Sequence, residues 1–213
     1  MSKFLDDLKN DHSDFDKGKL DSHLGDKPFE LFVKWYAEAF ENEQVANAMN
    51  VCTVSENGQP STRIVYLKEL FDEKFIFYTN YLSEKAKNIS DNNKVCLHFF
   101  WSQSQRQIRI DGTVKKVDSS MSDAYFASRP RESQLGAWAS HQSQFLESRD
   151  LLEQRLLELD AKYTKDVPRP PHWGGYEVEA TKVEFWQGRP SRLHDRIVYQ
   201  LEENNWSIFR LNP

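Results

Sequence analysis

Five short β-rich runs follow one another between residues 48 and 117, and this succession constrains the fold more than any other feature. The runs are rich in β-branched and aromatic residues and are joined by short polar segments. The dipeptide Asn57-Gly58 between the first two is typical of a hairpin turn. Strands that follow each other through hairpins predict an antiparallel barrel. The runs are Ala48 to Val54, Ser61 to Leu67, Lys74 to Thr79, Lys94 to Trp101 and Arg106 to Val117.

Helical patterns lie before and after these runs. A first helix is expected from about Asp26, with Pro28 in its first turn. Its apolar stripe would consist of Phe29, Phe32, Val33, Tyr36, Ala37 and Phe40. Further helices are expected at residues 83–89, at 121–127, after Pro130 as far as Trp138, and through Leu152, Leu156, Leu159 and Tyr163.

The tail returns to a β pattern at residues 176–180 and in a last hairpin, 196–201 with 206–211. The order β, α, β predicts one α+β domain, mainly β, over residues 26–213. Residues 1–25 carry many Asp and Lys and few large apolar side chains, which predicts a flexible N-terminal arm.

Charge and composition limit the classes of function. The chain has 33 Asp and Glu against 28 Lys and Arg, a formal charge of -5, so no overall field attracts nucleic acid. Its apolar runs are shorter than the ~20 residues that cross a bilayer, and no secretory pattern opens it. The six histidines are scattered, and Cys52 and Cys96 suit reduced thiols in strands. We therefore expect a cytoplasmic protein with no metal, membrane or nucleic-acid partner.

Two groups of residues in the β-rich half are suited to anions. Arg63 and Lys68 lie at the ends of one strand and would point to opposite faces unless the strand twists or ends. They fit two separate anions, or one anion and one surface charge, or they are both solvated cations. Thr79, followed by Ser83 and Lys85 at a helix start, has the residue types of a phosphate cradle. An ordinary serine cap explains that second pattern equally well.

Two further groups lie in the second half. Tyr125, Arg129 and Ser133 combine a guanidinium group with hydroxyl groups, which suits a phosphate monoester. A helix cap with a surface arginine pair, Arg129 and Arg131, is the alternative. Arg192, His194 and Arg196 would share one face of an extended chain, where an anion or an aromatic ring would relieve their repulsion. Solvated basic residues on an edge strand also fit this last pattern.

Taken together, these groups resemble the pyridoxine 5'-phosphate oxidase family, flavin enzymes that make pyridoxal 5'-phosphate. The similarity runs from about Pro28 to Pro213 and includes Ser128-Arg-Pro-Arg131, Gly136-Ala-Trp138, Pro171-His-Trp-Gly-Gly175, Glu184-Phe-Trp-Gln-Gly188, Arg192-Leu-His-Asp-Arg196 and Arg210-Leu-Asn-Pro213. It implies an FMN-binding split antiparallel β-barrel with flanking helices, and a homodimer with FMN at the interface. It also implies oxidation of pyridoxine or pyridoxamine 5'-phosphate, with O2 as electron acceptor and H2O2 as product.

The resemblance also assigns the site residues. Lys68, Tyr125, Arg129 and Ser133 would hold the substrate phosphate, and Arg192 and His194 would act at the pyridine ring as catalytic residues. FMN contacts would fall on Arg63, Ile64, Val65, Tyr66, Leu67, Lys68, Tyr78, Thr79, Lys85, Gln107, Gln142, Ser143, Trp186 and Arg196.

The chain departs from the family pattern at three places. Glu84-Lys85 stands where the family often has Arg-Lys, which puts a carboxylate near the FMN phosphate and implies looser FMN binding or a replacement cation. Val45-Ala46 stands where many members have an acidic residue and a proline before the first strand. In the N-terminal arm, His12-Ser13-Asp14-Phe15 matches the basic-acidic-Tyr stretch of the family only weakly, so no site residue is predicted there. Glu84 also supports one alternative, a non-catalytic binder of FMN or pyridoxal phosphate. A second alternative is another split-barrel flavoprotein with a different substrate.

Overall fold

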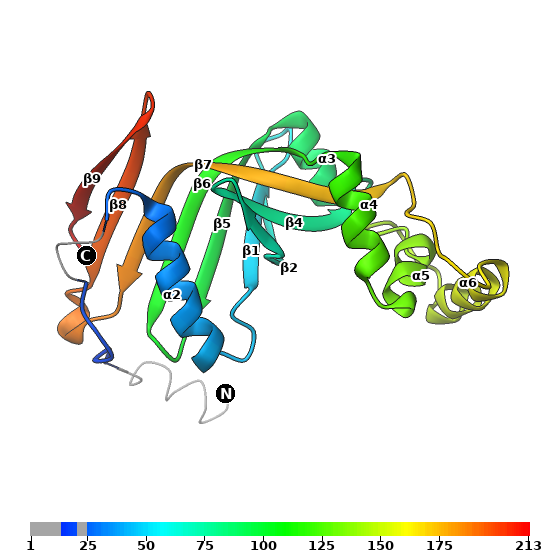
Figure 1. The fold of residues 1–213 in the computed structure, drawn as a ribbon, viewed down its shortest axis with the longest axis horizontal. Coiled ribbons are helices and arrows are strands. Elements are labelled where there is room, and N and C mark those ends of the chain that lie inside the picture. The colour runs from blue at the N-terminus through cyan, green and yellow to red at the C-terminus, as the bar shows by residue number, and fades with distance from the viewer. Residues whose placement is uncertain (1–13, 21–24) are drawn as a thin grey trace. The chain divides into compact units, whose positions relative to one another are not determined.

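The structure is a computed structural model that describes residues 14–20 and 25–213, in which antiparallel strands predominate (Figure 1). The described strands form one sheet in the order β2-β1-β5-β6-β7-β4-β3, with β8 paired to β7 and β9 paired to β8. The predicted α+β, mainly antiparallel class is therefore confirmed. The strands are β1 Ala48–Val54, β2 Pro60–Tyr66, β3 Glu69–Phe71, β4 Lys74–Asn80, β5 Lys94–Trp101, β6 Arg106–Lys116, β7 Trp173–Gln187, β8 Asp195–Glu202 and β9 Asn205–Leu211. The helices are α2 Pro28–Asn42, α3 Glu84–Asp91, α4 Ser119–Ser128, α5 Arg131–Ala139, α6 Arg149–Lys162 and the short 3-10 helix η2 Pro190–Arg192.

The chain forms two compact units, which we call the terminal unit and the central unit. The terminal unit contains residues up to Ala46, His98–Ile110 and Lys182–Pro213. The central unit contains Asn47–Leu97 and Asp111–Thr181. The expectation of one domain over residues 26–213 stays a prediction. In the described part of the chain, no helix combines the length and the apolar character needed to span a membrane.

In the terminal unit, α2 begins at Pro28, where a proline loses nothing because the first N–H groups of a helix have no partner within it. Its buried face meets aromatic side chains of the sheet. The ring centroids of Phe32 and Phe99 lie 5.5 Å apart, and those of Trp35 and Phe185 lie 5.2 Å apart. Phe185 also meets Tyr199 of β8 at 5.7 Å. These edge contacts between rings form the core of the terminal unit.

The predicted stripe of α2 is partly wrong. Val33 is 53% exposed and Phe40 is 68% exposed, whereas Leu31 and Trp35 are buried. Apolar side chains occur on more than one side of this helix, so periodicity alone does not say which side meets the sheet.

In the central unit, β1 and β2 form the predicted hairpin, with Val54 paired to Pro60. Gly58 has φ of +85° in the turn, a conformation that glycine adopts at little cost. Strand β4 pairs with β7 from Lys74↔Glu179 to Asn80↔Trp173.

A close approach at Gly175 helps to position the site. A Cβ atom at Gly175 would lie 2.8 Å from the ring of Tyr78 and 2.7 Å from a methyl group of Val117. Glycine therefore allows β7 to pass directly beside Tyr78.

Helices α4 and α5 cover a second apolar cluster in the central unit, formed by Phe126, Leu135, Val167 and Trp173. Helix α6 lies beside α5 (Figure 1). Arg131 at the start of α5 donates to Asp160 of α6, with Nη2 2.6 Å from Oδ1. It also donates to the backbone oxygen of Lys165 at 2.8 Å. Arg131 therefore ties α5 to α6 and to the segment that follows α6.

Candidate functional site

A cavity of about 590 Å³ lies in the central unit, and we call it the main cavity. Its wall comes from β2, β4, α3, α4, α5 and the start of β7. Eleven of the predicted site residues line it: Ile64, Val65, Tyr66, Lys68, Tyr78, Thr79, Lys85, Tyr125, Arg129, Ser133 and Gln142. Leu67 does not, because its side chain is buried and its N–H donates to the backbone oxygen of Asn47.

Arg129 is the most unusual residue of the main cavity. It follows the last turn of α4, and its guanidinium group lies 4.5 Å from the ring centroid of Trp173. Its Nη1 atom is buried and has no hydrogen-bond partner among the described residues. Burial lowers the pKa of Arg129, although a guanidinium group stays charged near neutral pH. A buried cationic donor without an acceptor is rare in folded proteins, and an anionic ligand would satisfy it.

Three aromatic rings stack beside Arg129. Tyr78 and Tyr125 are nearly parallel, with centroids 3.9 Å apart, and Tyr78 also stacks on Trp173 at 5.6 Å. The hydroxyl of Tyr78 donates to Oε1 of Glu69 at 2.9 Å. Burial and this hydrogen bond raise the pKa of Tyr78, so its ring stays neutral. The stack gives the cavity a flat, apolar wall against which a planar ligand can lie.

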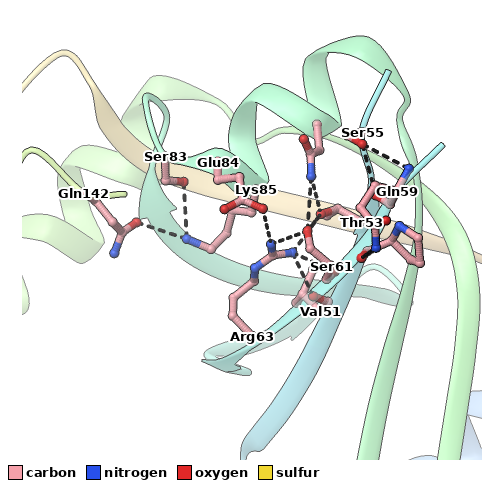
Figure 2. A network of polar contacts seen from close by, with 12 residues as sticks. Val51, Thr53, Ser55, Gln59, Ser61, Arg63, Ser83, Glu84, Lys85 and Gln142 are labelled. Carbon is pink, nitrogen blue, oxygen red and sulfur yellow. Dashed lines mark hydrogen bonds and ion pairs between the residues drawn. The ribbon is translucent and has the colours of Figure 1, made fainter. Parts of the chain in front are cut away.

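At the start of α3, Lys85 is buried at 6% exposure and points to neutral oxygens. Its Nζ donates to Thr79 Oγ1 at 3.1 Å, to Ser83 Oγ at 3.2 Å and to Gln142 Oε1 at 3.0 Å. Figure 2 shows Lys85 between Ser83 and Gln142. Burial, followed by the charge of Arg63, lowers the pKa of Lys85 to about 8, against the opposite effect of Glu84. A buried ammonium group held only by neutral oxygens suits an anionic ligand.

A side cavity of about 410 Å³ in the central unit is lined by Arg63, Glu84 and Ser143. Ile64, Lys85 and Gln142 line both cavities. Arg63 and Lys68 thus line different cavities, because β2 ends at Tyr66 and Lys68 lies beyond the strand.

The low pKa of Lys85 predicts a pH-dependent stability of the ligand-free protein. Because about 8 lies below the ordinary 10.5, the unfolded chain binds more protons between these values, and the free energy of unfolding rises with pH there. Between about pH 7.5 and 9.5, the free energy of unfolding of the wild type should rise by about 1–2 kcal/mol more than that of Lys85→Met. Urea unfolding across this range measures the difference.

The control for this experiment is Lys87→Met, which removes an exposed lysine from the same helix. This control should follow the wild type at every pH. If the wild type and Lys85→Met showed parallel pH profiles, Lys85 would not be the titrating group.

The other five predicted residues belong to the terminal unit: Gln107 on β6, Trp186 on β7, Arg192 in η2, His194 in the following loop and Arg196 on β8. Trp186 and Arg196 are directly paired across β7 and β8. The rings of Trp186 and His194 lie 4.5 Å apart.

A buried carboxylate orients Arg196. Glu184 is 2% exposed, and its Oε1 accepts from Arg196 Nε at 2.7 Å. Its Oε2 forms an ion pair with Arg109 Nη2 at 3.2 Å. The hydrogen bond to Glu184 raises the pKa of Arg196. Glu184 on β7 therefore holds two guanidinium groups, one from β6 and one from β8.

The prediction that Arg192, His194 and Arg196 share one face of an extended chain is wrong at Arg192. Ser191 and Arg192 have φ values of 59° and 60°, so the backbone turns through left-handed geometry before β8 begins at Asp195. Spacing rules for an extended chain do not apply across such a turn.

This turn also fixes the tautomer of His194. The backbone N–H of Arg189 donates to Nδ1 of His194 at 3.1 Å, so Nδ1 is the unprotonated nitrogen of the neutral ring. Burial and the charge of Arg192 lower the pKa of His194, and Asp14 opposes them. His194 is therefore mainly neutral near pH 7 and presents Nε2–H as a donor.

Residues 14–20 pack against the same part of the terminal unit. The ring of Phe15 meets those of Trp186 and His194 at 5.6 and 5.7 Å. Leu20 is buried, and its N–H donates to Asp195 Oδ2 at 3.1 Å. The rest of the predicted arm, residues 1–13 and 21–24, lies outside the described residues.

The sequence did not predict several residues that lie at the main cavity or beside the site residues of the terminal unit. Phe15 belongs to the N-terminal arm, for which no site residue is predicted, and Trp173 stands in a family motif that assigns it no role. Glu69 follows Lys68 directly but gave no sign of its bond to Tyr78. Glu184 did give a signal, because a lone acid between Val183 and Phe185 in an apolar strand needs a buried partner.

Comparison with known proteins decides the family. A family model described as Pyridoxamine 5'-phosphate oxidase matches residues 37–167. The chain belongs to the pyridoxamine 5'-phosphate oxidase family. A second model, described as the pyridoxine 5'-phosphate oxidase C-terminal dimerisation region, matches residues 173–213.

Full-length relatives agree with this family. A pyridoxine/pyridoxamine 5'-phosphate oxidase of Gloeothece citriformis is 47% identical over all of both chains. One of Actinobacillus succinogenes is 46% identical over 97% of this chain and all of its own. The chain is therefore an oxidoreductase of the pyridoxamine 5'-phosphate oxidase family, as its motifs indicated.

Solved structures confirm the split-barrel fold of the family. PhzG from Burkholderia lata, solved with tetrahydrophenazine-1-carboxylic acid, is 28% identical with a TM-score of 0.85 over 92% of this chain and all of its own. A pyridoxamine 5'-phosphate oxidase-related, FMN binding protein of Nostoc punctiforme has a TM-score of 0.69 over 88% of this chain and 98% of its own. The second protein is 16% identical and supports the fold alone.

Proposed function

We propose that the chain oxidises pyridoxine 5'-phosphate or pyridoxamine 5'-phosphate at C4' to pyridoxal 5'-phosphate, with FMN as cofactor and O2 as electron acceptor. The alcohol and O2 give the aldehyde and H2O2, and the amine also consumes water and releases ammonia. The observation that carries the proposal is the buried, unpartnered Nη1 of Arg129 in the main cavity. The full-length relatives named for this reaction give independent support.

The substrate would enter the main cavity with its phosphate toward Arg129. Lys68, Tyr125 and Ser133 line the same cavity and supply an ammonium group and two hydroxyls. The Nη1 atom of Arg129 is already shielded from water, so its bond to a phosphate oxygen would be strong. The stacked rings of Tyr78 and Tyr125 would offer their flat wall to the planar ligands. Together these groups would fix the position of the reacting carbon.

The residues around Lys85 fit the phosphate of FMN. Lys85 is a buried cation with only neutral partners, and Arg63 and Ser143 line the adjoining side cavity. Thr79 and Gln142 supply further hydrogen-bonding groups. Bound FMN would supply the redox chemistry, taking two electrons from the substrate and passing them to O2. The protein itself would bind, orient and exclude water.

Residues of the terminal unit would complete the site in a homodimer with FMN at the interface. The match of residues 173–213 to a dimerisation region supports this assembly. Exposed apolar side chains on β2 and β9, namely Ile64, Tyr66, Ile208 and Phe209, are suited to such an interface.

In this assembly Trp186 and Arg196 would contact FMN, and Arg192 and His194 would act at the pyridine ring. His194 would donate its Nε2–H to a polar group of the substrate, because its Nδ1 is occupied by the backbone of Arg189. Arg192 would lie on the ring through cation–π contact.

The direct test is turnover. Purified protein with FMN and pyridoxine 5'-phosphate should form H2O2 and the aldehyde in equal amounts under air. Pyridoxine without its phosphate is the matched control and should react far more slowly, since Arg129 would have no anion to bind. Equal rates for the two compounds would reject the phosphate site.

Glu84 favours a second candidate, a non-catalytic protein that binds FMN or pyridoxal phosphate, because a carboxylate weakens a phosphate site. The same experiment separates the two functions. A bound yellow flavin without any aldehyde or peroxide would support the binder and reject the oxidase.

The role of Arg192 predicts a kinetic loss without a stability loss. The Arg192 side chain is exposed in this chain, so Arg192→Ala should leave the unfolding temperature nearly unchanged. We expect kcat/KM for pyridoxine 5'-phosphate to fall about tenfold or more, since a cation–π contact to the substrate is lost. Arg189→Ala, in the same loop, serves as comparison: it removes side-chain contacts to the backbone oxygen of Gly18 and to Asp195, but it keeps the backbone N–H that donates to His194. Wild-type kinetics in Arg192→Ala would remove Arg192 from the site.

A further inference from the structure

Arg63 is held in place before any ligand arrives. Its Nη1 donates to Thr53 Oγ1 at 2.7 Å, and its Nη2 donates to Ser61 Oγ at 2.7 Å (Figure 2). Nη1 also meets the backbone oxygens of Val51 and Ser61 at 3.2 and 3.1 Å. From behind, Asn88 Nδ2 donates to Thr53 Oγ1 at 3.0 Å and to Ser61 Oγ at 3.3 Å. Neutral oxygens of β1 and β2 thus fix the guanidinium group, and Asn88 of α3 holds two of these oxygens in place.

The anion that meets this guanidinium group is Glu84. Its Oε1 lies 3.5 Å from Arg63 Nη2, and Figure 2 shows the contact at the start of α3. The Glu84 side chain is 61% exposed, whereas that of Arg63 is 21% exposed. Arg63, Glu84 and Lys85 all line the side cavity. Two buried or partly buried cations therefore share this cavity with one exposed carboxylate.

Glu84 occupies the two places in the side cavity that would attract a phosphate, the start of α3 and the guanidinium group of Arg63. It is the first residue of α3, where the N–H groups and the helix dipole favour a negative charge. It also lies against Arg63, whose planar group suits phosphate oxygens. An incoming phosphate would have to displace this carboxylate or accept its repulsion.

We propose that Glu84 acts as an internal competitor of the flavin phosphate, so that this protein distinguishes FMN from riboflavin only weakly. This inference rests on the proposed flavin site and concerns the selectivity of that site. Riboflavin has the same ring system as FMN but no phosphate, so the ratio of their dissociation constants reports the phosphate contacts alone. A phosphate monoester carries a charge of about -1.5 to -2 at neutral pH, and it therefore senses Glu84 strongly while riboflavin does not.

The test compares Glu84→Gln with the wild type after bound flavin has been removed. Dissociation constants for FMN and riboflavin are measured by quenching of flavin fluorescence at low and high salt. We expect Glu84→Gln to bind FMN about three- to tenfold more tightly, given the exposure of the pair, and riboflavin within about twofold of the wild type. The gain should shrink at high salt. Glu84→Arg should exceed Glu84→Gln in FMN affinity.

The matched control is Glu153→Gln, which removes the same charge from α6, where Glu153 pairs with Arg149. It should leave both flavins unaffected. Circular dichroism checks that each variant is folded. If FMN affinity were unchanged in Glu84→Gln, or if FMN and riboflavin shifted together, the competitor role would be rejected while the flavin site stood. If neither flavin bound to any variant, the flavin site and the role of Glu84 would both be rejected.

Discussion

Replacing Arg129 with alanine is expected to raise the KM for pyridoxine 5'-phosphate by about 100-fold, because a charge-assisted contact in a water-poor site is lost. The affinity for FMN should stay within about twofold, since Arg129 does not line the side cavity with Arg63. The folded protein should lose little stability, because the buried Nη1 of Arg129 has no hydrogen-bond partner among the described residues and its cation–π contact with Trp173 is the main contact removed. Steady-state kinetics, flavin titration and thermal unfolding measure the three quantities.

Arg131→Ala is the matched comparison, two residues further along. Arg131 binds Asp160 and backbone oxygens around the end of α6, so its loss should lower the unfolding temperature. Its KM should change much less than that of Arg129→Ala. A similar KM in Arg129→Ala and the wild type would show that the phosphate binds elsewhere.

Replacing Glu184 with glutamine is expected to destabilise the protein by about 3 kcal/mol, because a buried carboxylate between two guanidinium groups becomes neutral. Arg196 and Arg109 would then face each other across 2.7 and 3.2 Å contacts to a neutral amide. Both arginines are partly exposed, which keeps the loss below that of a fully buried triad. Urea unfolding measures it.

The same variant tests whether Arg196 helps to hold FMN. If Arg196 is a flavin contact oriented by Glu184, the FMN dissociation constant should rise in Glu184→Gln even at temperatures where the variant is folded. Glu202→Gln on the same β8 hairpin removes an exposed acid and should change neither quantity. Undiminished stability in Glu184→Gln would mean that the two arginines find other partners.

Most strands could be predicted from the sequence because each is a run of β-branched and aromatic residues closed by turn residues. The predicted bounds of β1 and β5 match the structure, and those of β2 differ by one residue at each end. The sequence does not predict strand β3, because Glu69–Phe71 is too short to show a period.

The local parts of the candidate site could also be predicted, whereas its pairings could not. Lys85 and Arg129 come from separate motifs, and the structure places them on one cavity. Glu84 pairs with Arg63, and Arg129 lies over the ring of Trp173, only because of the way β2, α3, α4 and β7 pack. Sequence spacing carries no information about such contacts between distant segments. The roles of all these residues toward ligands stay predictions.

The left-handed turn at Ser191 and Arg192 limits which sequences this loop can accept. Each L-residue with such a positive φ costs about 1–3 kcal/mol, because its Cβ crowds the backbone oxygens. Branched side chains such as valine or isoleucine tolerate this crowding worst, while glycine and asparagine tolerate it best. Substitutions at position 191 are therefore confined to small or polar residues. The loop that carries Arg192 and His194 has far less freedom to vary than its exposure on the surface suggests.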